Sequence, residues 1–249
     1  MSLPRFHVPE AAPGARIALP EHAAHHAREV LRLGPGQAVR VFDGAGHEWM
    51  ALLETVSRRG VTAHLGEAVV PRPESALRLV LAVSPLKGDR MELVVQKATE
   101  LGVAEIWPVI TARTDAQARP ALHGSRQERW EKVASGAAEQ CGRALVPGLA
   151  PTTTLDRLLA APFDGTKALL LETGAPPPLA SLARSSALLL LIGPAGGFEG
   201  WEAERLASAG FSAIGLGPRM LRAETAAIAA VALAQGLWGD LGPTPPAPR

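Results

Sequence analysis

Two glycine-rich stretches near the end of the chain have the residue types best suited to chemistry. They are residues 193–198 (GPAGGF) and residues 216–225 (LGPRMLRAET), and each lies between a strand pattern and a helix pattern. Turns at the carboxyl ends of neighbouring strands in an open α/β sheet form a crevice that binds small cofactors. Glycines let the backbone approach such a ligand closely. We therefore place the chemistry in this crevice.

A third loop, residues 171–174 (LETG), follows its strand pattern in the same way. Such loops serve plain packing, phosphate binding or cofactor binding, but the phosphate-loop and dinucleotide signatures are both missing here. Leucines in the loops would offer apolar walls to an adenine ring. The pattern favours an adenine-containing cofactor held by Leu171, Glu172, Gly174, Ile192, Gly193, Pro194, Gly196, Gly197, Leu216, Gly217, Arg219, Leu221 and Thr225.

The periodicity of the chain changes at residues 71–75 (PRPES), which predicts a domain of residues 1–72 and a second of residues 73–249. The first is mostly β, with strands in 38–50 and 61–70 and one helix over 19–33. In the second, strands alternate with helices, which predicts an α/β fold with a parallel sheet. Its expected strands are 77–83, 105–110, 168–171, 188–192 and 213–216, and its expected helices are 88–101, 125–142, 154–160, 199–209 and 224–238.

The composition excludes several classes of protein. A single cysteine, Cys141, rules out a disulfide framework and a cysteine zinc site, and it fits a buried helix stripe as a small core residue. Histidines at 22, 25 and 26 lack acidic or cysteine partners, so we expect no metal. Neither a signal-peptide pattern nor a membrane-length apolar run is present, which predicts a cytoplasmic protein.

The net charge is only +1, but arginine supplies nearly all of the positive charge. Arginine suits phosphate and base recognition, although a GC-rich genome gives the same bias, so composition alone does not establish nucleic-acid binding. Asn and Tyr are absent and Pro is abundant, which is a pattern found in thermophiles.

Four motifs in order along the chain resemble the bacterial 16S ribosomal RNA uridine-N3 methyltransferase family of the SPOUT class. They are residues 87–92 (KGDRME), 139–143 (EQCGR), 193–198 and 216–225. The resemblance implies a PUA-like β-barrel that helps to bind RNA, followed by an α/β domain tied in a deep trefoil knot. It also implies S-adenosylmethionine as cofactor and a homodimer with active sites at the interface. The family often has Glu where this chain has Ala195 and Thr where it has Ala223, so no role of that Glu is carried over.

Methylation at uracil N3 requires loss of a proton from an unpaired base. An arginine beside the uracil carbonyl oxygens would stabilise the developing negative charge. Arg222 is the first candidate, with a phosphate clamp or a salt bridge to Glu224 as its alternatives, and Arg143 is the second. No residue identifies itself as a general base. The candidate phosphate donors, each of which could equally be a solvated charge, are Arg5, His25, Arg28, Arg32, Lys87, Arg90 and Lys97.

Two other functions stay open from the residues alone. One is a non-catalytic RNA-binding or ribosome-assembly factor, and the other is a SPOUT enzyme that modifies a different RNA site. The helix over 224–238 is the expected dimer interface, through Ile228, Val231, Leu233, Leu237 and Trp238, with core packing as the alternative for Ile228 and Val231. The sequence does not distinguish free 16S RNA from the assembled small subunit as substrate, although the resemblance implies the assembled particle.

Overall fold

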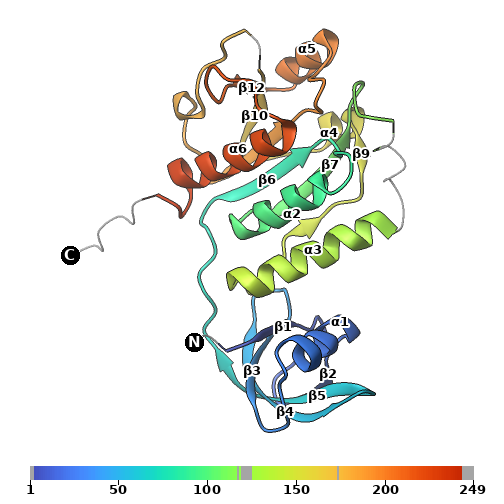
Figure 1. Ribbon diagram of the computed structural model, residues 1–249. Helices are drawn as coiled ribbons and strands as arrows, with labels where there is room; N and C mark the ends of the chain where they lie inside the picture. The colour runs from blue at the N-terminus through green and yellow to red at the C-terminus, as the bar shows by residue number, and fades with distance from the viewer. Residues whose placement is uncertain (1–2, 117, 119–124, 173, 243–249) are drawn as a thin grey trace, which may run out of the picture. The chain divides into compact units, whose positions relative to one another are not determined.

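The computed structural model describes residues 3–116, 118, 125–172 and 174–242, and the chain forms two compact units (Figure 1). Unit 1 comprises Met1–Pro73 together with Ser135–Val146, and unit 2 comprises Glu74–Ala134 and Pro147–Arg249. Nothing in the sequence pattern sets Ser135–Val146 apart from the rest of its helix. Its place in unit 1 means that the EQCGR motif packs with the amino-terminal strands.

Unit 1 is built on a five-stranded sheet. Its strands, in spatial order, are β1 (Arg5–His7), β3 (Ala38–Phe42), β4 (Glu48–Ser57), β5 (Gly60–Val69) and β2 (Arg16–Ala18). β1 pairs with β3 in parallel, and the other pairs are antiparallel. Alternate residues such as Val39, Val41, Leu53 and Leu65 are buried in one core, as expected for strands with a single buried face. The strands expected within 38–50 and 61–70 are therefore confirmed as β3, β4 and β5.

The helix expected over residues 19–33 is shorter than predicted. It comprises α1 (Glu21–His25) and a π-helical turn, His26–Val30, in which the Leu31 N–H donates to the His26 carbonyl. Arg32 then adopts a left-handed backbone conformation, with φ of 53°, and ends the helix. The physical reason is packing, because the small buried residues Ala23, Ala24 and Ala27 fix one face against the core while the chain turns towards β3.

Unit 2 contains the predicted α/β fold with a parallel sheet. The strands, in spatial order, are β12 (Phe211–Ile214), β10 (Thr166–Leu170), β11 (Ala187–Ile192), β6 (Arg78–Val83), β7 (Glu105–Ile110) and β8 (Gly148–Leu149), and β9 (Thr153–Thr154) also pairs with β7. All of these pairs are parallel. The continuous apolar runs of β6 and β11 are buried, as is typical of strands covered on both faces.

The helices of the alternating pattern are α2 (Arg90–Glu100), α3 (Ser125–Cys141), α4 (Leu155–Ala160), α5 (Gly200–Ser208) and α6 (Ala223–Trp238), and a short 3-10 helix, Leu179–Ser181, lies between β10 and β11. Gly102, with φ of 80°, follows α2 and lets the chain turn back. α2 and α6 pack against each other, and α6 lies on β6 and β11. No helix in the described part of the chain is long and apolar enough to span a membrane.

Candidate functional site

The loops that follow β10, β11 and β12 meet at one edge of the unit 2 sheet, where they surround a cavity of about 260 Å³. A smaller cavity of about 20 Å³ adjoins it and shares the wall residues Leu170, Leu171, Glu172 and Ala226. Parallel strands place their carboxyl ends on the same edge, which is where ligands bind in such sheets. The described chain thus has a crevice at the position that the sequence predicts.

Most of the predicted cofactor residues line one of these two cavities. They are Leu171, Glu172, Ile192, Gly193, Pro194, Gly196 and Gly197 in the larger or in both, and Leu216, Gly217, Arg219 and Leu221 in the smaller. Gly174 and Thr225 line neither, and both are exposed. That these lining residues contact a cofactor stays a prediction.

The glycines of the crevice are required by its geometry. A β-carbon on Gly193 would lie 2.7 Å from the Phe198 ring, which is itself part of the cavity wall. Gly197 and Gly217 have φ of 69° and 94°, in the left-handed region that side chains disfavour. The first loop closes through a hydrogen bond from the Gly197 N–H to the Pro194 carbonyl at 2.8 Å.

Arg113, which the sequence analysis did not single out, also lines the larger cavity. Its Nη1 donates to the Gly196 carbonyl at 2.8 Å, and its Nε and Nη2 donate to the two carboxylate oxygens of Glu199 at 2.8 and 3.1 Å. It follows β7, so its position at the same sheet edge was a signal that could have identified it. The first glycine loop is therefore joined by hydrogen bonds to the turn after β7.

Arg222 immediately precedes α6, where its carbonyl accepts the Ala226 N–H at 2.8 Å. Its side chain is exposed, and it does not line either cavity. The alternative salt bridge to Glu224 is not what the structure shows, because the carboxylate of Glu224 pairs with Arg90 at 3.7 Å. A charge-stabilising role and a phosphate clamp both remain compatible with this position.

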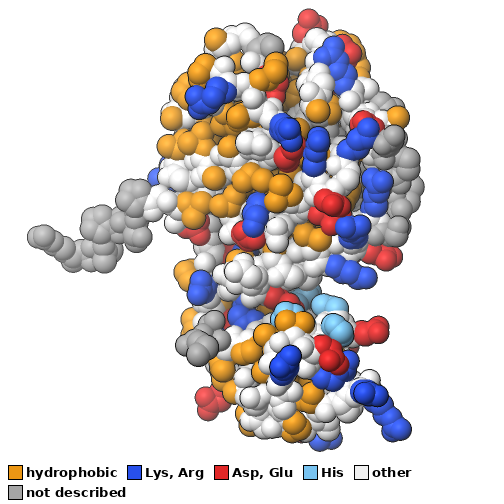
Figure 2. Space-filling view, in the orientation of Figure 1, with side chains coloured by type: hydrophobic (Ala, Val, Ile, Leu, Met, Phe, Trp, Pro, Cys, Tyr) orange, Lys and Arg blue, Asp and Glu red, His pale blue; other side chains and the backbone are white. Residues whose placement is uncertain are grey.

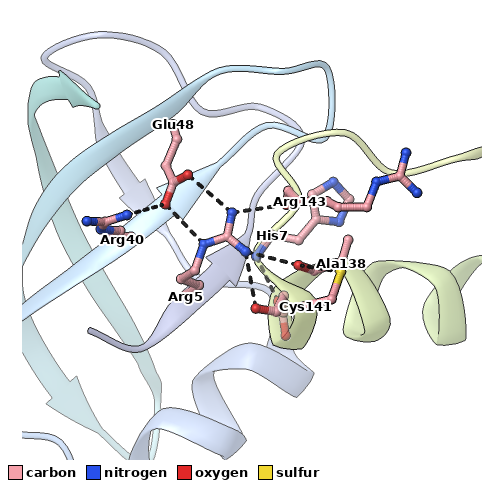
Figure 3. A network of polar contacts seen from close by, with 8 residues as sticks. Arg5, His7, Arg40, Glu48, Ala138, Cys141 and Arg143 are labelled. Atoms are coloured by element: carbon pink, nitrogen blue, oxygen red, sulfur yellow. Dashed lines mark hydrogen bonds and ion pairs between the residues drawn. The ribbon is translucent and has the colours of Figure 1, made fainter. Parts of the chain in front are cut away.

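Arg143 belongs to unit 1, where its carbonyl accepts an N–H from Arg5 Nη2 at 3.0 Å. Figure 3 shows the Arg143 side chain extending away from the Arg5 guanidinium. The EQCGR motif is anchored through its backbone, which leaves the role of the Arg143 side chain as a prediction.

Arg5 is fully occupied within unit 1. Its N–H groups donate to both carboxylate oxygens of Glu48 and to the carbonyls of Ala138, Glu139 and Arg143 (Figure 3). The Arg5 side chain is only 10% exposed, and its Cζ lies 4.6 Å from the centre of the Phe42 ring. We therefore correct its predicted role as a phosphate donor: Arg5 is a structural residue that caps the end of α3.

The other candidate phosphate donors are held less firmly. His25 and Arg32 are exposed, and Arg28 donates to the Ser57 carbonyl at 3.0 Å and to Glu29. Figure 2 shows histidine side chains gathered on the part of unit 1 that carries α1. In unit 2 the candidates form ion pairs. Lys87 pairs with Asp115 and Lys97 with Glu100, and Arg90 pairs with Glu224, which is buried.

Two titratable groups, one in the EQCGR motif and one in contact with it, have shifted pKa values. Burial raises the pKa of the Glu139 carboxyl, although this carboxyl accepts the His7 N–H at 2.7 Å and lies near Arg5. Burial also lowers the pKa of the His7 imidazole. Both shifts arise from desolvation of the charged form. Among the described residues no cluster of His, Cys, Asp and Glu could hold a metal ion.

Comparison with known proteins identifies relatives along most of the chain. A family model described as an RNA methyltransferase domain matches residues 73–235, and an RNA methyltransferase PUA domain matches residues 19–65. The Bacillus subtilis ribosomal RNA small subunit methyltransferase E is 31% identical over 216 residues, which cover 83% of this chain and 84% of the relative. Its Synechocystis counterpart is 34% identical and covers 90% of this chain and 74% of its own.

Solved structures give the same result. A ribosomal RNA small subunit methyltransferase E from Neisseria gonorrhoeae, bound to S-adenosyl methionine, matches with a TM-score of 0.86 and 35% identity over 96% of this chain and 99% of its own. A Legionella pneumophila protein in complex with SAM matches with a TM-score of 0.90 and 34% identity over 96% and 100% of the two chains. Both similar structures were therefore solved with this cofactor bound.

Proposed function

The chain belongs to the RNA methyltransferase family, with a PUA domain near its amino terminus, and on this premise we propose that it transfers a methyl group from S-adenosylmethionine to N3 of a uridine in 16S ribosomal RNA. The observation that carries the proposal is the convergence of three loops of unit 2 on one cavity, lined by most of the residues that the sequence assigns to a cofactor. Relatives of the same length crystallised with S-adenosylmethionine support it.

The residues that line the cavity suit the chemistry of S-adenosylmethionine. The larger cavity alone has a volume of about 260 Å³, slightly below the ~300–1,000 Å³ of small-molecule sites, and the smaller cavity adjoins it. Leu170, Leu171 and Ala226 give it an apolar wall suited to an adenine ring. Glu172, on the same wall, has the carboxylate that would accept hydrogen bonds from ribose hydroxyls. Gly196 and Gly197 let the backbone approach the ligand closely.

When bound, the sulfonium cofactor supplies an activated methyl group for in-line displacement. The protein then contributes mainly position and charge, since bringing the uracil N3 into line with the methyl carbon removes much of the barrier. The proton on N3 must leave to solvent before the new N–C bond is complete, so negative charge develops on the uracil ring and its carbonyl oxygens. Methyl transfer then breaks the C–S bond of the cofactor, which leaves as S-adenosylhomocysteine, and neutralises that charge. We assign stabilisation of that charge to the Arg222 guanidinium, with Arg143 as the second candidate.

The RNA-binding surface is assigned to unit 1, around α1 and the π-helical turn. Arg28, Arg32 and His25 would contact phosphates there, because recognition of structured RNA relies largely on backbone contacts. The uridine itself must be unpaired, since N3 lies on its Watson–Crick edge. The substrate is 16S RNA, and we favour the assembled small subunit over free RNA. We propose that the enzyme acts in the cytoplasm, because its proposed substrate is ribosomal RNA.

A deep trefoil knot in unit 2 and closure of the unit 1 sheet into a barrel are part of the proposal. In support of the knot, the segment after β12 lies against the chain that leads into β11: the Gly215 N–H donates to the Pro177 carbonyl at 2.9 Å, and Gly215 forms a bridge with Pro178.

We also propose a homodimer formed through α6. Leu233 and Leu237 are partly exposed one turn apart on this helix, which supports an interface there. Val231 and Trp238 are buried within unit 2, so they belong to the core, and Ile228 is half-buried. Sedimentation of the Leu233→Glu, Leu237→Glu double variant should show a monomer where the unmodified chain is a dimer, while a dimeric variant would contradict this interface.

The test of function is methyl mapping on small subunits purified from cells that lack this gene. A methyl group on N3 blocks Watson–Crick pairing, so primer extension on the 16S RNA should stop at one uridine only after incubation with enzyme and S-adenosylmethionine. Binding of S-adenosylmethionine without any methylation would favour a non-catalytic assembly factor. A stop in 23S RNA or transfer RNA would favour a different RNA site.

A further inference from the structure

The first glycine loop is held from outside by a clasp of hydrogen bonds that joins it to the turn after β7. Arg113 donates from Nη1 to the Gly196 carbonyl within the loop, and it forms a bidentate pair with Glu199 just after the loop, with donor–acceptor distances of 2.8 and 3.1 Å. Bidentate arginine–carboxylate pairs fix orientation as well as distance. The Arg113 side chain therefore binds both Gly196 within the loop and Glu199 directly after it.

The turn that carries Arg113 is itself anchored. The Thr111 N–H donates to the Thr114 hydroxyl at 2.8 Å, and the Thr111 hydroxyl is hydrogen bonded to that of Ser84 at 3.2 Å; all three side chains are buried. A hydroxyl network of this kind in the core is costly to distort. Arg113 thus extends from a rigid base at the carboxyl ends of β6 and β7.

A second, buried carboxylate joins the same two segments. Glu202, only 1% exposed, accepts the Ala112 N–H at 2.8 Å on one oxygen and the Glu199 N–H at 2.9 Å on the other. The backbones next to Arg113 and at Glu199 are therefore held together by Glu202 as well as by the arginine–glutamate pair. The clasp therefore has two parts. One is the partly exposed Arg113–Glu199 ion pair, and the other is the buried Glu202 carboxylate with its two backbone hydrogen bonds.

A loop with three glycines in five residues needs such restraint, because glycine loses more conformational entropy on ordering than any other residue. Binding is tighter when that ordering is complete before the ligand arrives. We propose that Arg113 is a positioning residue which, through Glu199, holds residues 193–198 in the cofactor-binding conformation. This inference rests on the proposed function for the identity of the ligand, but not for the order of the loop.

The test compares Arg113→Ala, Glu199→Gln and the double variant. Arg205→Ala is the control. Arg205 lies on α5, the helix that follows Glu199, forms an exposed pair with Asp156 on α4, and lines neither cavity. We expect each single change to raise the calorimetric Kd for S-adenosylhomocysteine by about tenfold, as for loss of a charged hydrogen bond. The double variant should be no weaker than Arg113→Ala alone, because the two side chains act as one unit.

Steady-state kinetics and hydrogen exchange give two further readouts. The KM for S-adenosylmethionine should rise while kcat changes by less than about twofold. The reason is that the conformation of the free loop affects cofactor binding and not methyl transfer in the bound complex. Arg113→Lys should restore only part of the affinity, because lysine cannot form the bidentate pair. In the absence of ligand, the hydrogen-exchange rate of the Gly197 amide should rise in both single variants. The same rate should be unchanged in Arg205→Ala.

Three outcomes would overturn the inference. Wild-type affinity in Arg113→Ala would do so, as would unchanged exchange at Gly197. Weak binding in Arg113→Ala beside wild-type binding in Glu199→Gln would also do so, since Arg113 would then contact the ligand itself. If the unmodified protein does not bind S-adenosylhomocysteine, the proposed function fails instead, and the exchange rates still decide whether the clasp orders the loop.

Discussion

Arg5 and Glu48 form a bidentate ion pair inside unit 1, with Nε 3.0 Å from Oε1 and Nη2 3.2 Å from Oε2. Glu48 is 2% exposed, and Arg40 is its other cationic neighbour at 3.5 Å. The remaining N–H groups of Arg5 cap carbonyls at the end of α3. One side chain thus neutralises a buried carboxylate and ties a distant segment of the chain to the first strand.

Replacement of Arg5 by Ala should therefore destabilise the fold strongly. It leaves the Glu48 carboxylate buried with only the longer Arg40 contact and leaves helix carbonyls without donors, a combination that costs about 3–5 kcal/mol. Urea unfolding measures this cost. Arg16→Ala is the control, because the Arg16–Glu54 pair lies at the surface, where ion pairs contribute little to stability. Equal losses in the two variants would show that the Arg5 network does not stabilise the protein.

Stability should also depend on pH through Glu139. Its raised pKa means that the folded state holds this proton more tightly than the unfolded state, for which the ordinary value is 4.5. The ionised form therefore opposes folding, and its cost appears as the pH rises above 4.5 through the folded-state pKa. Glu139→Gln keeps an acceptor for the His7 N–H and should be more stable than the unmodified chain at pH 7 but not at pH 4.

The opposite sign is expected at Glu54, which provides the matched control. Its hydrogen bond from Arg16 lowers the pKa of this carboxyl, so ionisation favours the folded state, and Glu54→Gln should lose stability at pH 7 relative to pH 4. Urea midpoints for both variants at the two pH values test the pair. A Glu139→Gln protein that is less stable at pH 7 would contradict the desolvation argument.

The fold of unit 2 was predictable because its strands and helices are long and regular. The strand expected over 188–192 and the helix expected over 88–101 agree with β11 and α2 to within two residues at each end. Two- and three-residue strands such as β8 and β2 were not predictable, since so few residues have no periodicity. Their pairing depends on partners far away in the chain.

The site was predictable where chemistry lies in backbone geometry, as at Gly193 and Gly197. It was not predictable where side chains meet across long sequence separations. Arg113 reaches Gly196 and Glu199 over more than eighty residues, and no local pattern encodes that contact. For Arg5 the local sequence suggested a wrong role. An arginine in a domain expected to bind RNA suggests a phosphate contact, and only the fold shows that its guanidinium is paired with the buried Glu48 carboxylate.

Gly193→Ala should weaken cofactor binding. Its β-carbon would lie 2.7 Å from the Phe198 ring, so this ring must move, and with it part of the cavity wall. We expect the Kd for S-adenosylmethionine to rise at least about tenfold, the equivalent of ~1.4 kcal/mol. Gly200→Ala is the control, because a β-carbon there meets nothing within 4 Å. Equal affinities by calorimetry in the two variants would place the cofactor elsewhere.

Arg32→Ala should weaken RNA binding without slowing methylation within the bound complex. Arg32 is exposed at the end of the π-helical turn, and loss of one phosphate contact should lower the slope of log K against log salt concentration by about one. The measurement is RNA affinity at several salt concentrations. Arg16→Ala, an exposed arginine on β2 that pairs with Glu54, should leave the slope unchanged. An unchanged slope in Arg32→Ala would remove this residue from the RNA surface.

Arg222→Ala tests the chemistry itself. The side chain is exposed and lines neither cavity, so the affinity for S-adenosylmethionine should stay close to that of the unmodified protein. If the guanidinium stabilises charge on the uracil carbonyl oxygens, single-turnover methylation at saturating enzyme and cofactor should slow by about a hundredfold or more. These conditions separate Arg222 from Arg32, whose loss should be overcome by saturation. A wild-type rate would make Arg222 a binding residue and move the charge-stabilising role to Arg143 or to backbone donors.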